Sequence, residues 1–521
     1  MDIDDRDTCY EIFRAKDARY DGRFFIGITS TGIYCRPVCK ARLPKPENCR
    51  YFLTAAEAEK AGFRPCMICR PELAPGASRI DASSELARKA VYFLRDNCDS
   101  GLSLAELSNL LGCSERHLRR VFKDEFNVTP VEYMQTCRLL LAKQLLTETQ
   151  LPVLDVAMTA GFGSVRRMNE LFRSRYGLSP LSFRRRARAE GGKPEKGKTK
   201  GGKPESGKIK GGKLEGGDRI LSGAETVTVS LGYRPPYDWD DVLAFLKPRA
   251  IPHVEIVADG AYERTLRLRS RGGKVCAGTI RVSNDAKSRA LNAEMSEPLV
   301  PVMSQVISKV RQMFDLDCDP EIIEEKLEGL KPYLPNGIVK GIRVPGCFDA
   351  FEMACRAIIG QQITVKAATT LIGRVAEACG GMIETGIEGL DRTFPDSREI
   401  AAMGGADGRG VTDDFGKLGV IASRSNAIYS LACALTEENG LRLDRAADPE
   451  TEMERLKKIR GIGNWTAQYV AMRTMGWTDA FMETDAGIRK ALPDMTDKER
   501  LKISEKWKPW RSYAMMELWR G

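Results

Sequence analysis

Cys35-Arg-Pro-Val-Cys39 and Cys66-Met-Ile-Cys69 are separated by 26 residues. Two cysteine pairs at this spacing can close a tetrahedral cage of four thiolates around one zinc ion. A zinc ribbon that only folds its domain is one interpretation of the pattern. Basic residues among and beside the cysteines, including Arg36 and Arg42, favour another interpretation, in which a reactive thiolate meets a DNA phosphate backbone and these arginines contact the DNA.

The length and composition bound the class of protein. A chain of 521 residues is long enough for several domains, each with its own core. No apolar run reaches the ~18 residues that a membrane helix needs, and the acidic start Met-Asp-Ile-Asp-Asp does not resemble a signal peptide. We therefore expect a cytoplasmic, nucleoid-associated protein without a membrane partner. Its 15 cysteines then indicate metal ligands or reactive thiols rather than disulfides.

The charge is unevenly distributed along the chain. The formal net charge is +10, and the excess of Lys and Arg lies before residue 218, whereas the remainder is close to neutral. A basic front half is typical of a protein that binds nucleic acid. A basic surface that serves only solubility is the alternative, and charge alone does not separate the two.

The sequence predicts a multidomain α+β protein. Its composition changes at four places, which divide the chain into five parts. The parts are a small zinc-binding domain at 1–78, an all-helical domain at 79–188, a linker at 189–222, a β-rich subdomain at 223–305 and a helical domain at 306–521. Alternating and β-branched residues predict strands at 226–231, 254–257 and 278–283. From about residue 301 the pattern is helical and interrupted by glycines.

The linker contains a ten-residue repeat, GGKPEKGKTK followed by GGKPESGKIK, within residues 191–217. The linker has too few apolar residues for their burial to offset the conformational entropy lost on ordering. We therefore expect a disordered tether that leaves the two halves mechanically independent. Its lysines either attract DNA weakly or serve only solubility.

Two helix-turn-helix patterns occupy 102–122 and 154–177, each with apolar residues at helical spacing and a glycine in the turn. The second helix of each unit is expected to enter the major groove of DNA and to present its first turns to the base edges. The residues expected to contact DNA there are Arg116, Arg119, Arg166 and Arg167.

A third DNA-binding pattern lies near the C-terminus, where Leu456-Lys-Lys-Ile-Arg precedes Gly461-Ile-Gly463 and a second helical run. Glycines allow the backbone to approach a phosphate, and the following helix offers free N–H groups to it. This pattern predicts a helix-hairpin-helix in which Gly461 and Gly463 contact the DNA backbone. An aspartate, Asp485, follows the hairpin, and this order resembles the DNA glycosylase superfamily.

Residues 25–42, 46–49 and 61–72 closely resemble the N-terminal domain of the Ada methylation-response family. The resemblance implies that Cys35, Cys39, Cys66 and Cys69 bind one zinc. It also implies that Cys35 accepts the methyl group of a DNA methylphosphotriester in a single turnover. The endings Phe126-Asn-Val-Thr-Pro130 and Tyr176-Gly-Leu-Ser-Pro180 make the helix-turn-helix pair resemble an AraC-type DNA-binding domain. The second acceptor motif of Ada proteins, Pro-Cys-His-Arg, does not occur in the sequence.

From about residue 229 to the end, the chain resembles AlkA, the 3-methyladenine DNA glycosylase family. The stretches that carry this likeness are 233–239, 345–351, 357–362 and 507–514. The resemblance implies a catalytic Asp485, and a base pocket made by Phe245, Trp465, Tyr469 and Trp519. Related glycosylases that also cut the DNA backbone have a lysine where this chain has Trp465, so a monofunctional enzyme is expected.

The chain departs from AlkA at two places. AlkA has an apolar side chain that fills the space left in the base stack when a nucleotide is flipped out. This chain has Gln362 at that position, and we expect it to contact DNA. Ala486 and Gly487 stand where AlkA has larger pocket residues, which leaves the base preference open.

These patterns together predict a fusion of an Ada-type regulator with an AlkA-type glycosylase. It would accept methyl groups on Cys35, activate transcription and excise alkylated bases such as 3-methyladenine and 7-methylguanine. Double-stranded DNA and RNA polymerase are the expected partners, and zinc is the expected cofactor. Two alternatives are a regulator whose glycosylase half is inert, and a glycosylase whose front half only anchors it to DNA.

Overall fold

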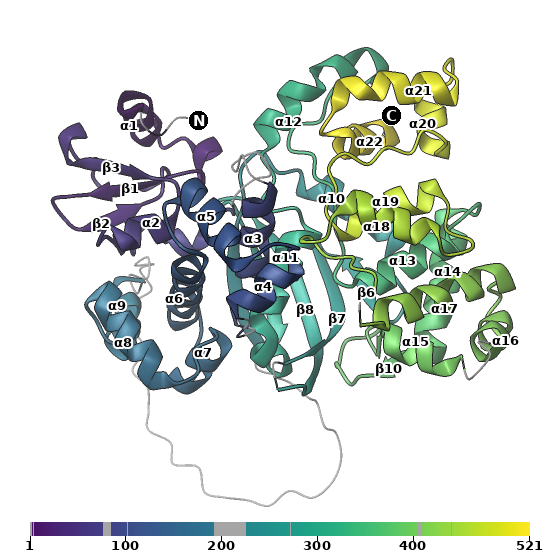
Figure 1. Ribbon diagram of the computed structural model, residues 1–521, viewed down its shortest axis with the longest axis horizontal. Coiled ribbons are helices and arrows are strands. Elements are labelled where there is room, and N and C mark those ends of the chain that lie inside the picture. Colours follow the sequence, from purple (N-terminus) through teal and green to yellow (C-terminus); the bar gives the residue numbers. More distant parts are fainter. Residues whose placement is uncertain are drawn as a thin grey trace, which may run out of the picture.

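The computed structural model describes most of the chain as a series of packed domains (Figure 1). The described residues are residue 3 and the ranges 5–76, 85–99, 101, 103–191, 226–270, 272–404, 409–438 and 440–520. The greater part of the expected linker, 192–222, lies outside them. Helix α9 ends at Gly191, so three residues that we assigned to the linker are helical.

The front domain is built on a four-stranded sheet with the strand order β3-β1-β2-β4. Strand β1 pairs antiparallel with β2 and β3, and β2 pairs parallel with β4. The elements are α1 (Arg6–Ala15), η1 (Ala18–Tyr20), β1 (Phe25–Ile28), β2 (Ile33–Cys35), η2 (Pro46–Asn48), β3 (Cys49–Phe52), α2 (Ala55–Lys60), β4 (Arg64–Pro65) and η3 (Pro71–Leu73). All four predicted zinc ligands lie at or just after β2 and β4, which are neighbours in the sheet.

The next domain is entirely helical, as the sequence predicts. Its helices are α3 (Glu85–Asp96), α4 (Leu104–Leu110), α5 (Glu115–Phe126), α6 (Pro130–Glu148), α7 (Val153–Thr159), α8 (Val165–Tyr176) and α9 (Pro180–Gly191). Ser114 and Ser164 cap α5 and α8 by accepting backbone N–H bonds of 3.3 and 3.2 Å. Helix α6, 19 residues long, connects the two helix-turn-helix units.

The β-rich subdomain is a five-stranded antiparallel sheet in the order β5-β9-β8-β7-β6. Its elements are β5 (Thr226–Gly232), α10 (Trp239–Leu246), η4 (Lys247–Arg249), β6 (Glu255–Ala258), β7 (Ala261–Arg269), β8 (Val275–Asp285), β9 (Ala290–Ser296) and η5 (Glu297–Val302). The sequence pattern located β5, β6 and β8 but not β7 or β9. Strand β7 carries a charged residue on its buried face, Arg264, whose guanidinium pairs with Glu352 at 2.6 Å.

The rest of the chain is helical apart from one short hairpin. Its elements are α11 (Met303–Met313), α12 (Pro320–Leu327), η6 (Glu328–Tyr333), α13 (Ala350–Ile359), α14 (Val365–Cys379), β10 (Gly381–Met382), β11 (Arg392–Thr393), α15 (Ser397–Met403), α16 (Arg409–Lys417), α17 (Ala422–Thr436), α18 (Pro449–Lys457), α19 (Asn464–Thr474), α20 (Ala486–Ala491), α21 (Asp497–Ser504), η7 (Glu505–Trp507) and α22 (Arg511–Arg520). Among the helices that the structure describes, none is long and apolar enough to cross a membrane.

The two halves of the chain are packed against each other, and the expectation that they are mechanically independent is wrong for this structure. One apolar core joins Leu139 and Phe172 of the helix-turn-helix domain to Val229 and Leu299 of the β-rich subdomain. Figure 1 shows the front half lying along one side of the sheet. Linker composition did not predict this arrangement, because the contact surfaces lie outside the linker.

Candidate functional site

Four cysteine sulfur atoms form one compact cluster in the front domain. The Sγ atoms of Cys35, Cys39, Cys66 and Cys69 all lie within 4.8 Å of one another, and those of Cys39 and Cys66 are 4.0 Å apart. A tetrahedral zinc with Zn–S bonds of about 2.3 Å requires sulfur separations of about 3.8 Å. The donor set and the spacing therefore fit one zinc ion, as the sequence predicts.

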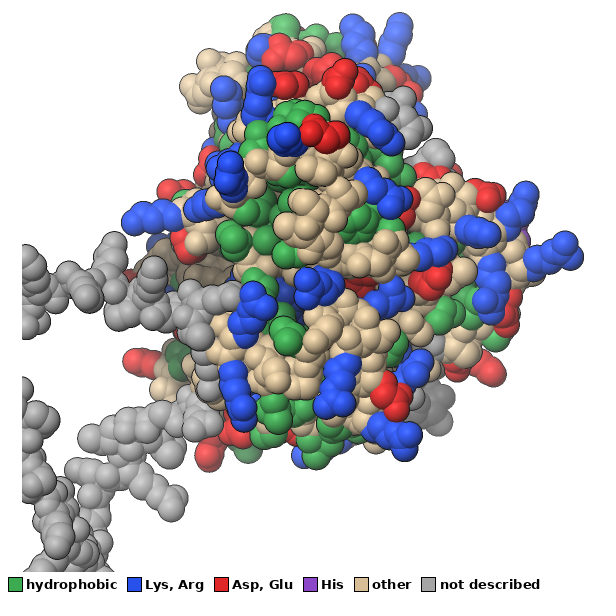
Figure 2. Space-filling view, turned by 90° about the vertical axis from the view of Figure 1, so that its left-hand side faces the viewer, with side chains coloured by type: hydrophobic (Ala, Val, Ile, Leu, Met, Phe, Trp, Pro, Cys, Tyr) green, Lys and Arg blue, Asp and Glu red, His purple; other side chains and the backbone are tan. Residues whose placement is uncertain are grey.

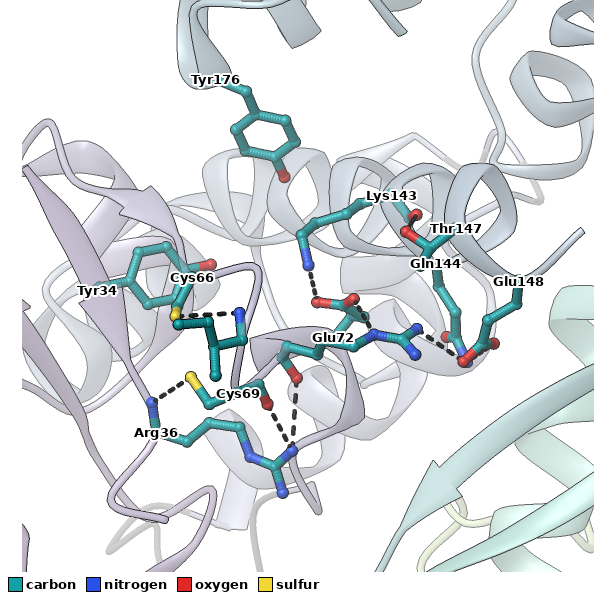
Figure 3. Close-up of polar contacts among 12 residues, drawn as sticks. Tyr34, Arg36, Cys66, Cys69, Glu72, Lys143, Gln144, Thr147, Glu148 and Tyr176 are labelled. Carbon is teal, nitrogen blue, oxygen red and sulfur yellow. Dashed lines mark hydrogen bonds and ion pairs between the residues drawn. The ribbon is translucent and has the colours of Figure 1, made fainter. Parts of the chain in front are cut away.

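The four sulfurs differ in their hydrogen bonds. The backbone N–H of Arg36 donates to Cys69 Sγ at 3.3 Å, and that of Ile68 donates to Cys66 Sγ at 3.4 Å (Figure 3). Within the described part of the chain, no such bond reaches Cys35 Sγ. Because N–H donors draw charge from a thiolate, Cys35 keeps more of its nucleophilicity than Cys66 or Cys69. Cys35 is nevertheless 1% exposed.

The basic side chains near the cluster divide into a paired and an exposed set. The Arg36 guanidinium lies inside the domain, where Nε donates to Asp21 Oδ1 at 2.8 Å and Nη1 donates to the Cys69 carbonyl at 2.9 Å. Arg70 is paired with Glu72 and with Glu148 of α6. The exposed set consists of Lys40, Arg42 and Arg64. Arg42 is therefore accessible at the surface, and DNA contacts by Arg42 and by Arg36 stay predictions.

A buried carboxyl group, Glu59 of α2, lies where the front domain meets the helix-turn-helix domain. Its oxygens accept hydrogen bonds from Tyr34 at 3.2 Å, Thr136 at 3.1 Å and Tyr176 at 3.4 Å. Burial raises the pKa of Glu59 to about 7, against the opposing effects of Arg175 and the three hydroxyl groups. The interface between these two domains therefore contains a group that titrates near neutral pH.

We expect stability to fall as the pH rises through the range from about 4.5 to about 7. The folded chain holds the Glu59 proton up to about pH 7, whereas the unfolded chain loses it near the usual value of 4.5, so folding becomes less favourable over this window. A Glu59→Gln variant should lose the part of this dependence that Glu59 contributes, since an amide keeps the hydrogen-bond acceptor but does not titrate. Glu517, whose pKa burial also raises to about 7, should keep its own part. Melting temperatures between pH 5 and 8 measure the effect, with exposed Glu47→Gln as control. An unchanged pH dependence in Glu59→Gln would contradict the assignment.

The two recognition helices present their predicted DNA contacts to solvent. Arg116 and Arg119 on α5 and Arg166 and Arg167 on α8 are all exposed. Arg119 and Arg166 each make an ion pair within their own helix, with Glu115 and Glu170. Figure 2, which views the front-half side of the molecule, shows Lys and Arg side chains spread over this face among fewer acidic ones. These arginines are available to DNA in the present arrangement.

The carboxylate of Asp485 is the centre of a second site, at the start of α20. Its Oδ1 atom caps the helix by accepting the backbone N–H of Gly487 at 2.8 Å, and it also accepts the indole N–H of Trp519 at 2.8 Å. Its Oδ2 atom accepts the indole N–H of Trp465 at 3.0 Å. Donors on both oxygens fix the carboxylate orientation, which holds its charge at one position.

The four aromatic residues predicted from the family resemblance come together beside this carboxylate, and we call them the aromatic cluster. Trp465 and Tyr469 of α19 stack with ring centroids 5.2 Å apart and planes 7° apart. Phe245 of α10 stacks with Trp519 of α22 at 6.4 Å. Residues more than 270 positions apart in the chain thus form one site of aromatic rings. The sequence pattern alone could not show that they lie together.

Arginines contact the aromatic cluster, and sequence reasoning missed them. Arg473 donates to the Tyr469 hydroxyl at 2.6 Å, and the Arg249 guanidinium lies 4.0 Å from the centre of the Phe245 ring. Burial alone would raise the pKa of Tyr469, but these two guanidinium groups and Arg356 lower it below its usual value. An arginine four residues after Tyr469 on the same helix was the only available sequence signal.

The hairpin between α18 and α19 has the backbone that a phosphate contact needs. Gly461 adopts φ +96°, and Gly463 is exposed, with open space where a Cβ would lie. Gln361 connects this hairpin to the neighbouring loop by donating to the Gly461 carbonyl at 2.9 Å. The next residue, Gln362, is exposed at φ +56°, and it is free to project from the same surface as the hairpin.

Gly487, one of the departures from AlkA, has a packing role. A Cβ at this position would lie 2.6 Å from Cδ1 and 3.1 Å from Nε1 of Trp519. The indole could then not remain beside Asp485. The absence of a side chain at Gly487 therefore allows Trp519 to bond the carboxylate.

A Gly487→Ala variant should excise bases roughly tenfold more slowly, because displacement of Trp519 removes one hydrogen bond from Asp485 and disturbs the aromatic cluster. Single-turnover base release from alkylated DNA measures the effect. Gly416→Ala in α16, where a Cβ meets nothing, is the matched control and should be neutral. Equal rates for the two variants would show that the Trp519 contact does not matter.

The fold and the two sites define a class of protein in which a four-cysteine metal-binding domain and a helix-turn-helix pair precede a glycosylase-type helix-hairpin-helix half. Sequence models of three families match the chain: the metal binding domain of Ada at 8–72, a helix-turn-helix domain at 107–186 and the AlkA N-terminal domain at 228–349.

Relatives cover both the whole chain and its parts. The "Probable bifunctional transcriptional activator/DNA repair enzyme AlkA" of Mycobacterium tuberculosis is 33% identical over 99% of this chain and 96% of its own length. The Escherichia coli "DNA-3-methyladenine glycosylase 2" is 36% identical over 56% of this chain and 96% of its own length. The Bacillus subtilis "Bifunctional transcriptional activator/DNA repair enzyme AdaA" is 34% identical over 33% of this chain and 80% of its own length. The chain belongs to the family of the bifunctional AlkA protein, and the predicted fusion of Ada-type and AlkA-type parts is confirmed.

Proposed function

We propose that the chain repairs alkylated DNA in two ways and regulates transcription in response to the damage. Its C-terminal half excises alkylated bases with Asp485, and its front half accepts methyl groups from DNA methylphosphotriesters on Cys35. The observation that carries the proposal is the Asp485 carboxylate, oriented by two indole N–H groups beside the aromatic cluster. A core-packing role for four aromatic residues would not require a fixed carboxylate among them.

The glycosylase reaction follows from the chemistry of this site. A nucleotide turned out of the duplex would place its base against the aromatic faces of Trp465 and Tyr469. Alkylated purines carry positive charge, which aromatic faces attract and which already weakens the glycosidic bond. As that bond breaks, the base leaves with its electron pair, and the Asp485 carboxylate stabilises the positive charge on the sugar. Water then adds to the sugar carbon, and an abasic site remains.

The same geometry favours base removal without cutting of the DNA backbone. A backbone-cutting glycosylase needs an amine that forms a covalent bond to the sugar. Where the backbone-cutting glycosylases have a lysine, this chain has Trp465, whose indole nitrogen lies 3.0 Å from Asp485 Oδ2. An indole N–H cannot act as that nucleophile.

The methyl transfer would be a direct displacement at carbon. The Cys35 sulfur forms a bond to the methyl carbon while the carbon–oxygen bond of the phosphotriester breaks, and the phosphodiester leaves as an anion. One zinc ion bound by the four cysteines keeps them deprotonated at neutral pH. Cys35 is the candidate acceptor because it matches the acceptor cysteine of the Ada family, and the backbone N–H bonds to Cys66 and Cys69 make those two sulfurs less nucleophilic. Because Cys35 is buried, bound DNA must displace the residues that cover it.

The transfer also supplies a signal. It converts a Cys35 thiolate into a neutral thioether and removes one negative charge from the DNA-facing domain. Repulsion of the phosphate backbone then falls, and affinity for promoter DNA rises. Activation of transcription through RNA polymerase would follow from tighter promoter binding by α5 and α8.

One experiment tests both activities and separates the alternatives. The full chain is incubated with DNA treated with a methylating agent, released bases are analysed, and peptides are mapped by mass. We expect released 3-methyladenine together with one methyl group on Cys35. Methylated Cys35 without base release would leave a regulator with an inert glycosylase half. Base release without any methylated cysteine would leave a glycosylase anchored by its front half.

A further inference from the structure

Three acidic residues, Asp317 and Asp319 just before α12 and Glu321 in its first turn, face three arginines of the front half. Arg95 of α3 pairs with Asp317, Arg23 pairs with Asp319, and Arg19 pairs with Glu321. The first two pairs are largely shielded from water, with side-chain exposures of 18% and 3% for Arg95 and Asp317, and 13% and 1% for Arg23 and Asp319. Buried charges persist only when they are paired, so these contacts are more specific than surface ion pairs.

Asp317 is the centre of this contact. Its carboxylate also accepts the backbone N–H of Gly76 at 2.9 Å, from the last described residue of the front domain. Within its own half it pairs with Arg311 at 3.2 Å and Arg445 at 3.4 Å. Burial would raise the pKa of Asp317, but Arg95, Arg311 and Arg445 lower it far below the usual range. The carboxylate therefore stays charged at any physiological pH and keeps its partners.

A second contact covers the open edge of the five-stranded sheet. Ser230 of the edge strand β5 donates its N–H to Glu148 at 3.3 Å, and its carbonyl accepts the Gln144 amide at 2.9 Å. Both partners belong to α6 (Figure 3). An exposed strand edge is a template for unwanted pairing, and side chains from the front half satisfy it here.

Close approach of the two backbones marks the same edge. A Cβ at Gly232 of β5 would lie 2.1 Å from the carbonyl oxygen of Leu73, so only glycine allows this contact. The neighbouring Arg234 is fully buried, and its guanidinium donates to the carbonyls of Gly76 at 2.8 Å and Asp317 at 3.0 Å. Without the front half, Arg234 would lose the bond to the Gly76 carbonyl and keep those to Asp317 and Cys318.

The contact leaves the predicted DNA-binding residues of both halves accessible. Arg116 and Arg166 on the recognition helices are exposed, and so are Gly463 of the hairpin and Gln362. Docking therefore does not block either set of contacts.

We propose that the start of α12 and the edge of β5 form a dedicated docking surface for the front half, which holds the two halves together independently of the linker. The methyl-accepting domain and the glycosylase then move as one body. DNA binding by one of them therefore also brings the other to the DNA. This inference rests on the contacts between the halves and holds whether or not either half is active.

Cleavage of the linker in the folded full-length chain tests the proposal. A protease site is placed between residues 200 and 215, and the chain is cut there. Size-exclusion chromatography then shows whether the two fragments stay together, and the affinity of the fragments for each other is measured. We expect the two fragments to elute together. Separate elution of the wild-type fragments at physiological salt would overturn the proposal.

A pair of substitutions identifies the contact. Arg95→Gln with Arg23→Gln should weaken association of the fragments at least about 30-fold, because each change removes one partner of a buried ion pair. Asp317 keeps Arg311 and Arg445 in this variant, so the glycosylase half should remain folded. Arg6→Gln with Arg14→Gln makes the same charge change at exposed positions of α1 and is the control. Zinc content and melting curves report folding of both. Unchanged association of the Arg95 and Arg23 variant would refute the assigned surface.

Discussion

An Asp485→Asn variant is expected to release alkylated bases from DNA at least ~10²-fold more slowly than the wild-type chain. The carboxylate charge is what stabilises the positive sugar as the glycosidic bond breaks. Asparagine is still a good N-cap, and its oxygen can accept the Gly487 N–H, so α20 should remain folded. Because both carboxylate oxygens accept hydrogen bonds, however, the asparagine NH₂ group must face one of these N–H donors. The variant therefore loses an orienting bond as well as the charge.

Single-turnover base release from methylated DNA measures this loss. Affinity for undamaged DNA should hardly change, since Gly461 and Gly463 still offer their backbone to a phosphate. Methyl acceptance should also persist, because every hydrogen-bond partner of Asp485 lies in the C-terminal half. Asp494→Asn, which removes an equal charge at an exposed position, is the matched control. Near-normal release of 3-methyladenine by Asp485→Asn would require the catalytic assignment to be abandoned.

The sequence predicts best the features whose residues lie near one another along the chain. The intervals between Cys35, Cys39, Cys66 and Cys69 identified a metal cluster that the fold brings together. Ser114 and Ser164 cap the recognition helices, and such capping is a local interaction. The hairpin glycines and Asp485 were found in the same way. In each of these cases the deciding residues lie within one or two adjacent elements.

Features that depend on distant parts of the chain were not predictable from local pattern. Arg95 and Asp317 are 222 positions apart, and in the sequence each is an ordinary charged residue of a helix or loop. Only the packed structure shows that they pair. It also shows that the two halves contact each other through residues outside the linker. Phe245 and Trp519 were matched through family resemblance, because nothing local connects a helix after β5 to the last helix.

Partners from other segments bear on residues with two possible interpretations. Arg36, next to a zinc ligand, has the charge of a DNA contact, which stays a prediction, and Asp21 and the Cys69 carbonyl hold its guanidinium inside the domain. Gly487 could have affected only the base preference, whereas its missing side chain is what admits Trp519. In both cases the residue type was informative, but its role depended on a neighbour from another segment.

A Cys66→Ser variant is expected to lose the zinc ion and with it the fold of the front domain. Zinc binding supplies about 10–16 kcal/mol in small zinc-finger peptides, more than the total stability of most domains of this size. Cys66 lies in the buried cluster, 4.0 Å from Cys39, and a serine hydroxyl is a poor zinc ligand because it stays protonated. Metal analysis of the full-length chain should give one zinc per wild-type molecule and close to none for the variant.

The matched control is Cys49→Ser, a buried cysteine of the same domain that lies outside the four-sulfur cluster. It should keep its zinc, and both variants should still excise bases if the glycosylase half folds without its partner. Cys35→Ser should also lose methyl acceptance, since no thiolate remains at the proposed acceptor. A folded front domain without zinc in the wild-type chain would refute the metal site. Methyl transfer to Cys39, Cys66 or Cys69 instead of Cys35 would refute the acceptor, because those sulfurs would then be the more reactive ones despite the N–H bonds to Cys66 and Cys69.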